Sequence, residues 1–253
     1  MLTDASVLIT GGLGRLGQAI AVAVEARGGV PVLTSRDPGK IALFNREAEE
    51  AGRRARARLL AADEEAQVGR FVEALMQDYP SVAGLVNNAY PALPYTDVEH
   101  TDWQQWMQAA RIGLGWPLTL AAALVERQKR TRVLSIVNVA SIYGVVAPDF
   151  AIYPPGRDPT PIYNGAIKAA LIQQTRYLAV YWAERGVRIN AVSPGGILDN
   201  QDPEFLRRYN ATVPMRRMVT REEVASTVCF LLSQEAGGIT GQNIAIDGGR
   251  AIR

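Results

Sequence analysis

The stretch LITGGLGRLGQAI, residues 8–20, joins a short apolar run to a segment with helical periodicity. Glycines at such a junction let the backbone turn tightly and approach a pyrophosphate closely. The helix that begins there offers free N–H groups and a partial positive charge to the phosphates. A tight turn without a ligand also uses glycine, but phosphate binding requires this position between the first strand and the first helix. We therefore expect a dinucleotide to contact Gly11, Gly14, Arg15, Leu16 and Gly17.

The remainder of the chain alternates apolar, strand-like runs with helical segments. Continuous rather than alternating hydrophobicity is typical of strands that are buried on both faces of a parallel sheet. We therefore predict an α/β fold, a doubly wound parallel sheet of about seven strands with helices on both faces. With no linker or internal repeat, we expect residues 1–253 to form a single dinucleotide-binding and catalytic domain. The strands are expected at 6–10, 30–35, 58–62, 84–89, 132–141, 187–196 and 243–247.

The composition excludes several classes of protein. A formal charge of +2 gives no concentrated basic face for nucleic acid. Cys229 is the only cysteine, so an intrachain disulfide is impossible. His100 is the only histidine, which argues against a histidine-based zinc site or a Ser-His-Asp triad, and we expect no metal. No stretch reaches 18 apolar residues, which predicts a cytoplasmic protein without a signal peptide or a membrane span.

The end of the second strand bears on the choice of cofactor. An acidic residue there accepts hydrogen bonds from the adenosine ribose, whereas a basic residue suits the 2′-phosphate of NADP. In the sequence TSRD, Ser35 and Arg36 come first and Asp37 follows. A solvated loop arginine is the alternative interpretation of Arg36. We favour NADP(H), with NAD(H) as the other candidate.

Six motifs in order make a family resemblance specific. They are TGGLGRLG, NNAY, NVAS, TPIYNGAIKAAL, VRINAVSPGG and TGQNIAIDGG. With them the chain resembles the short-chain dehydrogenase/reductase family over almost its whole length. The resemblance implies a Rossmann-type fold, a nicotinamide cofactor, and hydride transfer to or from a carbonyl or alcohol carbon. It also implies a homo-oligomer, often a tetramer.

The resemblance implies roles for four further residues along the cofactor. Asn88 and Ala89 match positions near the adenosine-side ribose, and Pro194 and Gly195 match the loop beneath the nicotinamide. Asp199 stands where a threonine often meets the cofactor phosphates, and its charge would be unwelcome beside them.

The sequence also departs from the usual family pattern at positions that point to different branches of the family. Arg15 stands where the family more often has glycine, and the loop looks like that of the pteridine reductases, which use NADPH. A TG-x-x-G-x-x-G spacing also fits, and that spacing looks like the branch that acts on nucleotide sugars. The helical stretch AARIGLGWPL, residues 109–118, lacks the family's usual asparagine.

The catalytic residues follow from the same match. Ser141 matches the serine that hydrogen-bonds the substrate oxygen, and Lys168 matches the lysine that holds the nicotinamide ribose and lowers the pKa of a tyrosine. Tyr163 lies five residues before Lys168, about 140° away on a regular helix, while Asn164 lies four before. Either a π-bulge eased by Gly165 or a position just before the helix would bring Tyr163 to the site. The alternative is that Asn164 fills the catalytic place and Tyr163 packs elsewhere. We expect Tyr163 to be the proton donor.

The segment between Ser141 and Tyr163 is long, and its ASIYGVVAPDF run resembles reductases of nonulosonic-acid pathways. Its residues Tyr143, Phe150 and Tyr153 either line a pocket for a sugar or flat ring or pack a surface loop. The leading hypothesis is an NADP(H)-dependent oxidoreductase that reduces a carbonyl, or oxidises an alcohol, of a small polar or ring-shaped substrate. The rival is a catalytically impaired nucleotide-binding protein that acts by binding or assembly.

The expected helix 163–185 carries aromatic and apolar residues around its circumference. Tyr177, Val180, Tyr181 and Trp182 are spread around it. One face should pack on the sheet, which leaves apolar and aromatic surface for a partner helix, more than a monomer usually exposes. We therefore predict a homotetramer or dimer through this helix.

Overall fold

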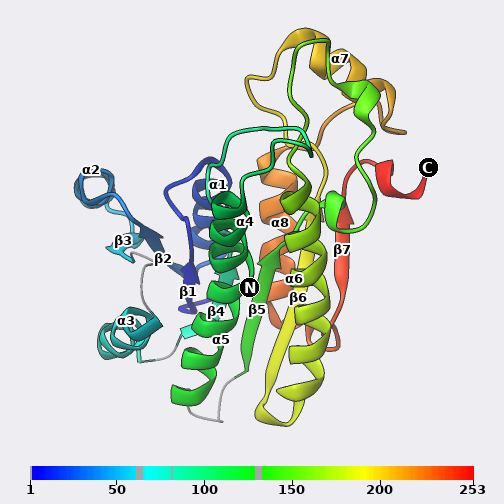
Figure 1. Ribbon diagram of the computed structural model, residues 1–253. Helices are drawn as coiled ribbons and strands as arrows, with labels where there is room; N and C mark the ends of the chain where they lie inside the picture. The colour runs from blue at the N-terminus through cyan, green and yellow to red at the C-terminus, as the bar shows by residue number, and fades with distance from the viewer. Residues whose placement is uncertain (1, 61–64, 81, 129–132) are drawn as a thin grey trace.

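The computed structural model describes residues 2–60, 65–80, 82–128 and 133–253. Within them, seven strands form one parallel sheet in the order β3-β2-β1-β4-β5-β6-β7 (Figure 1). The strands are β1 Ser6–Ile9, β2 Val30–Ser35, β3 Arg56–Leu59, β4 Val82–Asn87, β5 Leu134–Val139, β6 Val187–Pro194 and β7 Asn243–Ile246. The predicted α/β fold with a seven-stranded parallel sheet is confirmed. Residues 61–62 of the expected third strand and residue 132 of the expected fifth lie outside the described residues.

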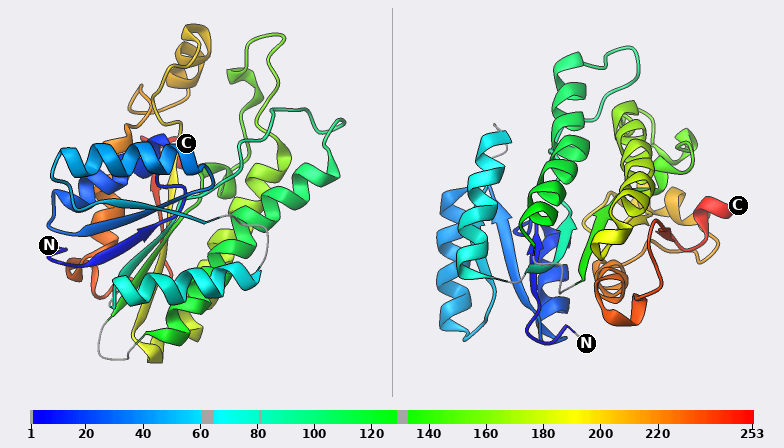
Figure 2. Two further views of the ribbon diagram at one scale, coloured as in Figure 1. Left: turned by 90° about the vertical axis from the view of Figure 1, so that its left-hand side faces the viewer. Right: turned by 90° about the horizontal axis from the view of Figure 1, so that it is seen from below.

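Helices cover both faces of the sheet (Figure 2). Helices α1, α2 and α8 lie on one face, and α3, α5 and α6 lie on the other. No helix in these described ranges combines the length and apolarity needed to cross a bilayer. The helices are α1 Arg15–Glu25, α2 Pro38–Glu50, α3 Glu65–Asp78, α4 Trp103–Ala110, α5 Trp116–Arg127, α6 Ile162–Tyr181, α7 Pro203–Ala211 and α8 Arg221–Leu232, and a π-helical turn, Arg111–Gly115, joins α4 to α5.

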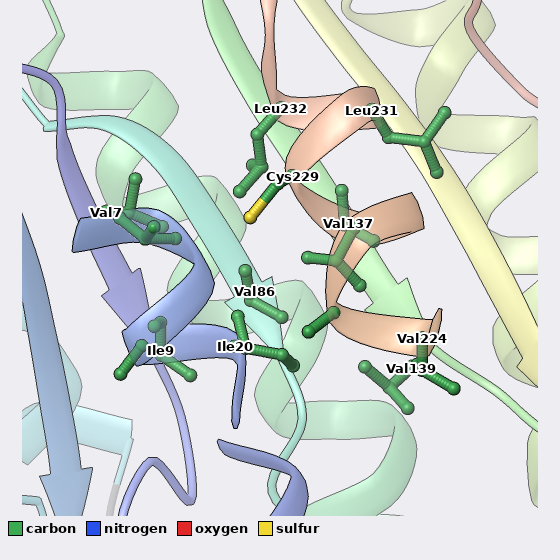
Figure 3. Packing of buried hydrophobic residues seen from close by; sticks show 14 of the residues in the cluster. Val7, Ile9, Ile20, Val86, Val137, Val139, Val224, Cys229, Leu231 and Leu232 are labelled. Carbon is green, nitrogen blue, oxygen red and sulfur yellow. The ribbon is translucent and has the colours of Figure 1, made fainter. Parts of the chain in front are cut away.

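Each face of the sheet has its own apolar core. Figure 3 shows Ile20 of α1 and Val224 of α8 packed over Val86 and Val137 of the central strands. The sole cysteine, Cys229, belongs to this core, and burial raises the pKa of its thiol to about 11. The helices of the opposite face pack on a second cluster that includes Trp116, Leu120 and Trp182. Of the four apolar and aromatic residues noted around the expected helix 163–185, Trp182 lies in this second core, on the side that packs on the sheet.

The sheet order places the functional loops together. In a parallel sheet, the loops that follow the strands emerge at one edge, and ligands bind where the strand order reverses. Here β1 lies between β2 and β4, so the glycine loop after β1 has the loops after β2 and β4 beside it. The loops after β5 and β6 follow along the same edge, which predicts one continuous site.

Candidate active site

The glycine loop is built so that the start of α1 rests directly on backbone. A Cβ added to Gly17 would lie 2.6 Å from the Gly11 carbonyl oxygen and 2.7 Å from Gly12 Cα. Gly11 has a φ of +60°, in the left-handed region that favours glycine. Gly14 caps α1 without a side-chain hydrogen bond, so no side chain occupies the first N–H groups of the helix. The loop therefore fits a pyrophosphate.

A cavity of about 500 Å³ opens beside this loop. It is lined by residues from the ends of β1, β2 and β4 and from the helices beyond them. The structure thus brings together nine of the cofactor residues expected from the sequence. They are Gly11, Gly14, Arg15, Leu16, Gly17, Ser35, Arg36, Asn88 and Ala89. Pro194 and Gly195 lie at the end of β6, and Gly195 N donates to the Ile246 carbonyl at 2.9 Å.

Hydrogen bonds hold the loop after β4 against the glycine loop. Thr10 Oγ1 accepts from the backbone N–H groups of Asn88 and Ala89, both at 3.0 Å. The Asn88 side-chain amide donates to the carbonyl oxygens of Thr10 at 3.0 Å and Gly11 at 3.2 Å. Asn88 therefore fixes the shape of the cleft as well as lining it.

The end of β2 presents positive charge to the cleft. Asp37 Oδ1 accepts from Lys40 N at 3.0 Å, so this carboxylate caps helix α2. Arg36 and Lys40 line the cavity, whereas Asp37 is not among its lining residues. An adenosine 2′-phosphate would find cationic partners at this end of the cavity.

Asp199 does not leave an isolated negative charge near the cleft. Its carboxylate contacts the guanidinium of Arg15 on the glycine loop, and Arg221 Nη2 at the start of α8 at 2.8 Å. Two arginines therefore compensate one carboxylate, and the expected conflict with cofactor phosphates is relieved.

Ser141 follows the end of β5, and Lys168, in the second turn of α6, reaches the same strand end. Ser141 Oγ accepts from Tyr143 N at 3.2 Å, which leaves its O–H free to donate to a substrate oxygen. Lys168 Nζ donates to the carbonyl oxygen of Val139 at 2.7 Å. Burial lowers the pKa of Lys168 to about 8. The 142–144 turn packs on α6 so closely that a Cβ on Gly144 would lie 2.7 Å from the Lys168 carbonyl carbon.

The structure does not bring Tyr163 to this pair. Helix α6 is α-helical from Ile162 through Tyr181, so the expected π-bulge is absent there and Tyr163 lies inside the first turn. The single O–H of Tyr163 has two acceptors within reach, the Pro94 carbonyl oxygen at 3.2 Å and Gln105 Oε1 at 3.4 Å. Its ring meets the Trp106 ring edge-on, with centroids 6.3 Å apart. Helical geometry thus turns Tyr163 toward α4, as the alternative interpretation anticipated.

Asn164 occupies the position one turn before Lys168. A side-chain amide is too weak an acid to donate a proton in catalysis. A π-helical turn does occur elsewhere, at Arg111–Gly115, in the stretch that lacks the family's asparagine.

Sequence reasoning assigned no role to Tyr90, the last residue of the NNAY motif. Its ring lines the cleft, and Lys168 Nζ lies 4.4 Å from the ring centroid. Burial raises the pKa of Tyr90 well above its ordinary value, and the nearby Tyr163 adds to the rise. The available signal was a large aromatic residue at the end of a motif that is expected to face the cofactor.

The aromatic residues of the long segment after Ser141 lie in two different places, a cavity beside α6 and a packed contact with α7. Tyr143 and Phe150 line a second cavity of about 450 Å³ beside the start of α6. Tyr153 shares a hydrogen bond with Thr160 Oγ1 at 2.8 Å and packs on Phe205 of α7. Two of the three predicted pocket residues therefore line a cavity.

Comparisons with known proteins agree with this architecture. A family model described as Enoyl-(Acyl carrier protein) reductase matches residues 14–251. Galactitol 2-dehydrogenase (L-tagatose-forming) from Cereibacter sphaeroides is 31% identical, and the match covers 99% of this chain and 96% of that protein. The chain belongs to the short-chain dehydrogenase/reductase family, and this places it among the oxidoreductases.

Two solved structures extend the comparison. A short-chain dehydrogenase from Leptospira borgpetersenii with bound NAD+ is 26% identical with a TM-score of 0.86, covering 98% of this chain and 93% of that one. A gluconate 5-dehydrogenase from Burkholderia cenocepacia, in complex with NADP and tartrate, has a TM-score of 0.88 at 22% identity, covering 100% and 97%. The second likeness is one of fold.

Proposed function

We propose that the protein is an NADP(H)-dependent oxidoreductase that reduces a carbonyl, or oxidises an alcohol, of a small polar or ring-shaped substrate. The single observation that carries the proposal is the set of side chains that meet at the edge of the sheet where the strands end. There the glycine-loop cavity is lined by Arg36 and Lys40 and also by Tyr90, whose ring lies against the Lys168 ammonium at the end of β5. The fold of NAD- and NADP-bound relatives supports a nicotinamide dinucleotide as the cofactor.

The chain's own residues divide the work around the reacting carbonyl. A bound nicotinamide supplies or accepts the hydride. Ser141 donates its O–H to the carbonyl oxygen and stabilises the charge that develops there. Lys168, with a pKa lowered to about 8, is a usable acid near neutral pH and holds the proton that this oxygen takes up.

The test is NADPH oxidation followed at 340 nm against a panel of small carbonyl compounds and sugars. Turnover by the parent protein, with a loss of about 100-fold or more in both Ser141→Ala and Lys168→Met, would support the proposal. Failure of the parent to turn over any member of the panel, despite binding NADPH, would favour the rival function below.

The preference for NADP(H) predicts a gap between the two reduced cofactors. If Arg36 holds the 2′-phosphate, NADPH binds more tightly than NADH by about 1–3 kcal/mol, the range for charge-assisted hydrogen bonds. Arg36→Ala should remove most of that gap in a fluorescence titration. Arg46→Ala is the matched control, because Arg46 is an exposed arginine of α2 and is not among the residues that line the cavity. Equal affinities of the parent for NADPH and NADH would rule out the 2′-phosphate contact.

The placement of Tyr163 predicts that its hydroxyl serves packing. Tyr163→Phe should change turnover by less than a few-fold and lower the free energy of unfolding by about 1 kcal/mol, because the hydrogen bond of the single O–H, which Pro94 and Gln105 share, is lost. Steady-state rates and urea unfolding measure the two effects. A drop in turnover of about 100-fold with unchanged NADPH affinity would restore Tyr163 as the proton donor and require the start of α6 to rearrange on binding.

A second candidate function has its own observation. Asn164 stands one turn before Lys168, and Tyr163 faces α4, so the pair lacks the expected phenol. A catalytically impaired protein that binds the nucleotide and acts by binding or assembly would have this site. Tight NADPH binding without turnover on the whole panel distinguishes it from the enzyme.

The outer face of α6 supports assembly into a dimer or tetramer. Tyr177 and Tyr181 stack with centroids 6.2 Å apart, and Val180 between them is 82% exposed. Light scattering at micromolar concentration should give a multiple of the 27.5 kDa chain mass. Val180→Glu should reduce the measured mass toward that of a single chain. Val22→Glu, at an exposed valine of α1, should leave the mass unchanged. A parent protein that is monomeric at this concentration would disprove assembly through α6.

A further inference from the structure

The ammonium of Lys168 is buried with few partners. It carries three N–H donors. One of them reaches the Val139 carbonyl at the end of β5, at 2.7 Å. The ring of Tyr90, from the loop after β4, lies on another side, with its centroid 4.4 Å from Nζ. A cation at this distance over an aromatic face is attracted by the negative potential of the ring.

The fold reserves space for this ring. A Cβ added to Gly113 would lie 2.6 Å from Tyr90 Cε2 and 3.0 Å from Cδ2. Gly113 is in the π-helical turn Arg111–Gly115, where the helix lacks the family's asparagine. The bare backbone of this turn therefore allows the Tyr90 ring to lie beside Lys168.

The contact belongs to the ring and not to the hydroxyl. Tyr90 Oη is buried and has no hydrogen-bond partner among the described residues. Burial keeps this phenol protonated by raising its pKa. The lowered pKa of Lys168 is caused by burial, with no contribution from any described charged side chain. Tyr90 and the Val139 carbonyl are the groups observed to face its ammonium.

We infer that Tyr90 is a positioning residue for Lys168. The face of the Tyr90 ring holds the lysine ammonium against the Val139 carbonyl, and the ring occupies the space that Gly113 leaves open. The inference deepens the proposed function, on which it rests, because it names the group that orients the proposed acid. The structure places this ring where the cleft meets the lysine.

The titration of Lys168 tests this directly, without substrate or cofactor. The chain has three lysines, so ¹³C-lysine labelling gives a simple NMR spectrum, and Lys40 on α2 is the exposed reference. Tyr90→Leu removes the ring's attraction for the charged form, so the pKa of Lys168 should fall by about half to one unit. Tyr90→Phe keeps the ring face and should leave this pKa unchanged. It should also leave the melting temperature equal or higher, since a buried unpartnered hydroxyl is removed.

Gly113→Ala supplies a second, independent variant. Its Cβ would displace the ring, so the pKa of Lys168 should fall as in Tyr90→Leu. In the Tyr90→Leu background the same alanine should add little further shift, because no ring remains to be displaced. This pairing separates loss of the contact from general damage to the fold.

Three results would overturn the inference. A pKa of Lys168 that stays constant or rises in Tyr90→Leu would mean that the ring merely excludes water. An equal fall in Tyr90→Phe would assign the effect to the hydroxyl. Additive shifts of Gly113→Ala and Tyr90→Leu would place the two residues in separate interactions. A parent protein without turnover would sink the proposed function but leave these titrations interpretable.

Discussion

Gly17→Ala is expected to abolish dinucleotide binding and to lower the free energy of unfolding by about 3 kcal/mol or more. The added Cβ would meet the Gly11 carbonyl oxygen at 2.6 Å and the backbone of Gly12 at 2.7 Å. Backbone cannot rotate away as a side chain can, so either the glycine loop or the start of α1 must shift. Both changes displace the N–H groups that would bind phosphate.

Gly69→Ala is the matched control for this experiment. Gly69 lies inside α3, and a Cβ there would meet nothing within 4 Å. Alanine should therefore stabilise the protein by about 0.5–1 kcal/mol through helix propensity alone. Urea unfolding and NADPH fluorescence titration measure both variants. A Gly17→Ala protein that is as stable as the parent and binds NADPH normally would show that the loop does not hold the cofactor.

Lys168→Met is expected to stabilise the protein near neutral pH while abolishing turnover. Burial lowers the pKa of Lys168 from 10.5 to about 8, so keeping the ammonium charged in the fold at pH 7 costs on the order of 3 kcal/mol. Methionine removes this cost but also the hydrogen bond to Val139, worth about 1 kcal/mol. The net gain of about 2 kcal/mol corresponds to a rise in Tm of roughly 4–8 °C.

The pH dependence identifies the cause of this stabilisation. Between about pH 8 and 10.5 the unfolded chain holds the lysine proton and the folded protein has released it, so the stability of the parent rises with pH in that window. The advantage of Lys168→Met is therefore complete below about pH 8 and disappears above 10.5. Lys40→Met, at an exposed lysine, should show no such trend. A difference between Lys168→Met and parent that is constant from pH 7 to 10.5 would contradict the buried-ammonium account.

The sequence was sufficient to predict the structure where a short stretch of residues determines the backbone conformation. Glycine spacing between a strand and a helix predicted the loop at residues 11–17, because the backbone geometry of that turn needs those residues whatever surrounds them. Continuous apolar runs predicted the parallel sheet for a similar reason. The one-residue offset of Tyr163 from Lys168 was also visible, and helix periodicity alone favoured the arrangement that the structure shows.

Contacts between residues that are far apart in the sequence could not be predicted in this way. Tyr90 meets Lys168 only because the loop after β4 reaches α6 and because Gly113, in the turn between α4 and α5, has no side chain in the way of the ring. The π-helical turn arises in the helix where no sequence signal marked it. Asp199 looked unfavourable beside phosphates, since its two arginine partners lie far away along the chain.

The bridge from Arg15 through Asp199 to Arg221 has a consequence for the order in which the chain folds. It joins the first helix to a loop near the C-terminus, so it is a contact of very high sequence separation. Such contacts form late, because closing a long loop costs entropy before the contact stabilises anything. The cavity beside the glycine loop is lined by residues between 11 and 116, in the first half of the chain, whereas Asp199 and Arg221 of the bridge come from the second half. A nascent chain therefore contains every residue that lines this cavity before Asp199 is synthesised, and the charge of Arg15 gains its carboxylate partner only in the later part of synthesis.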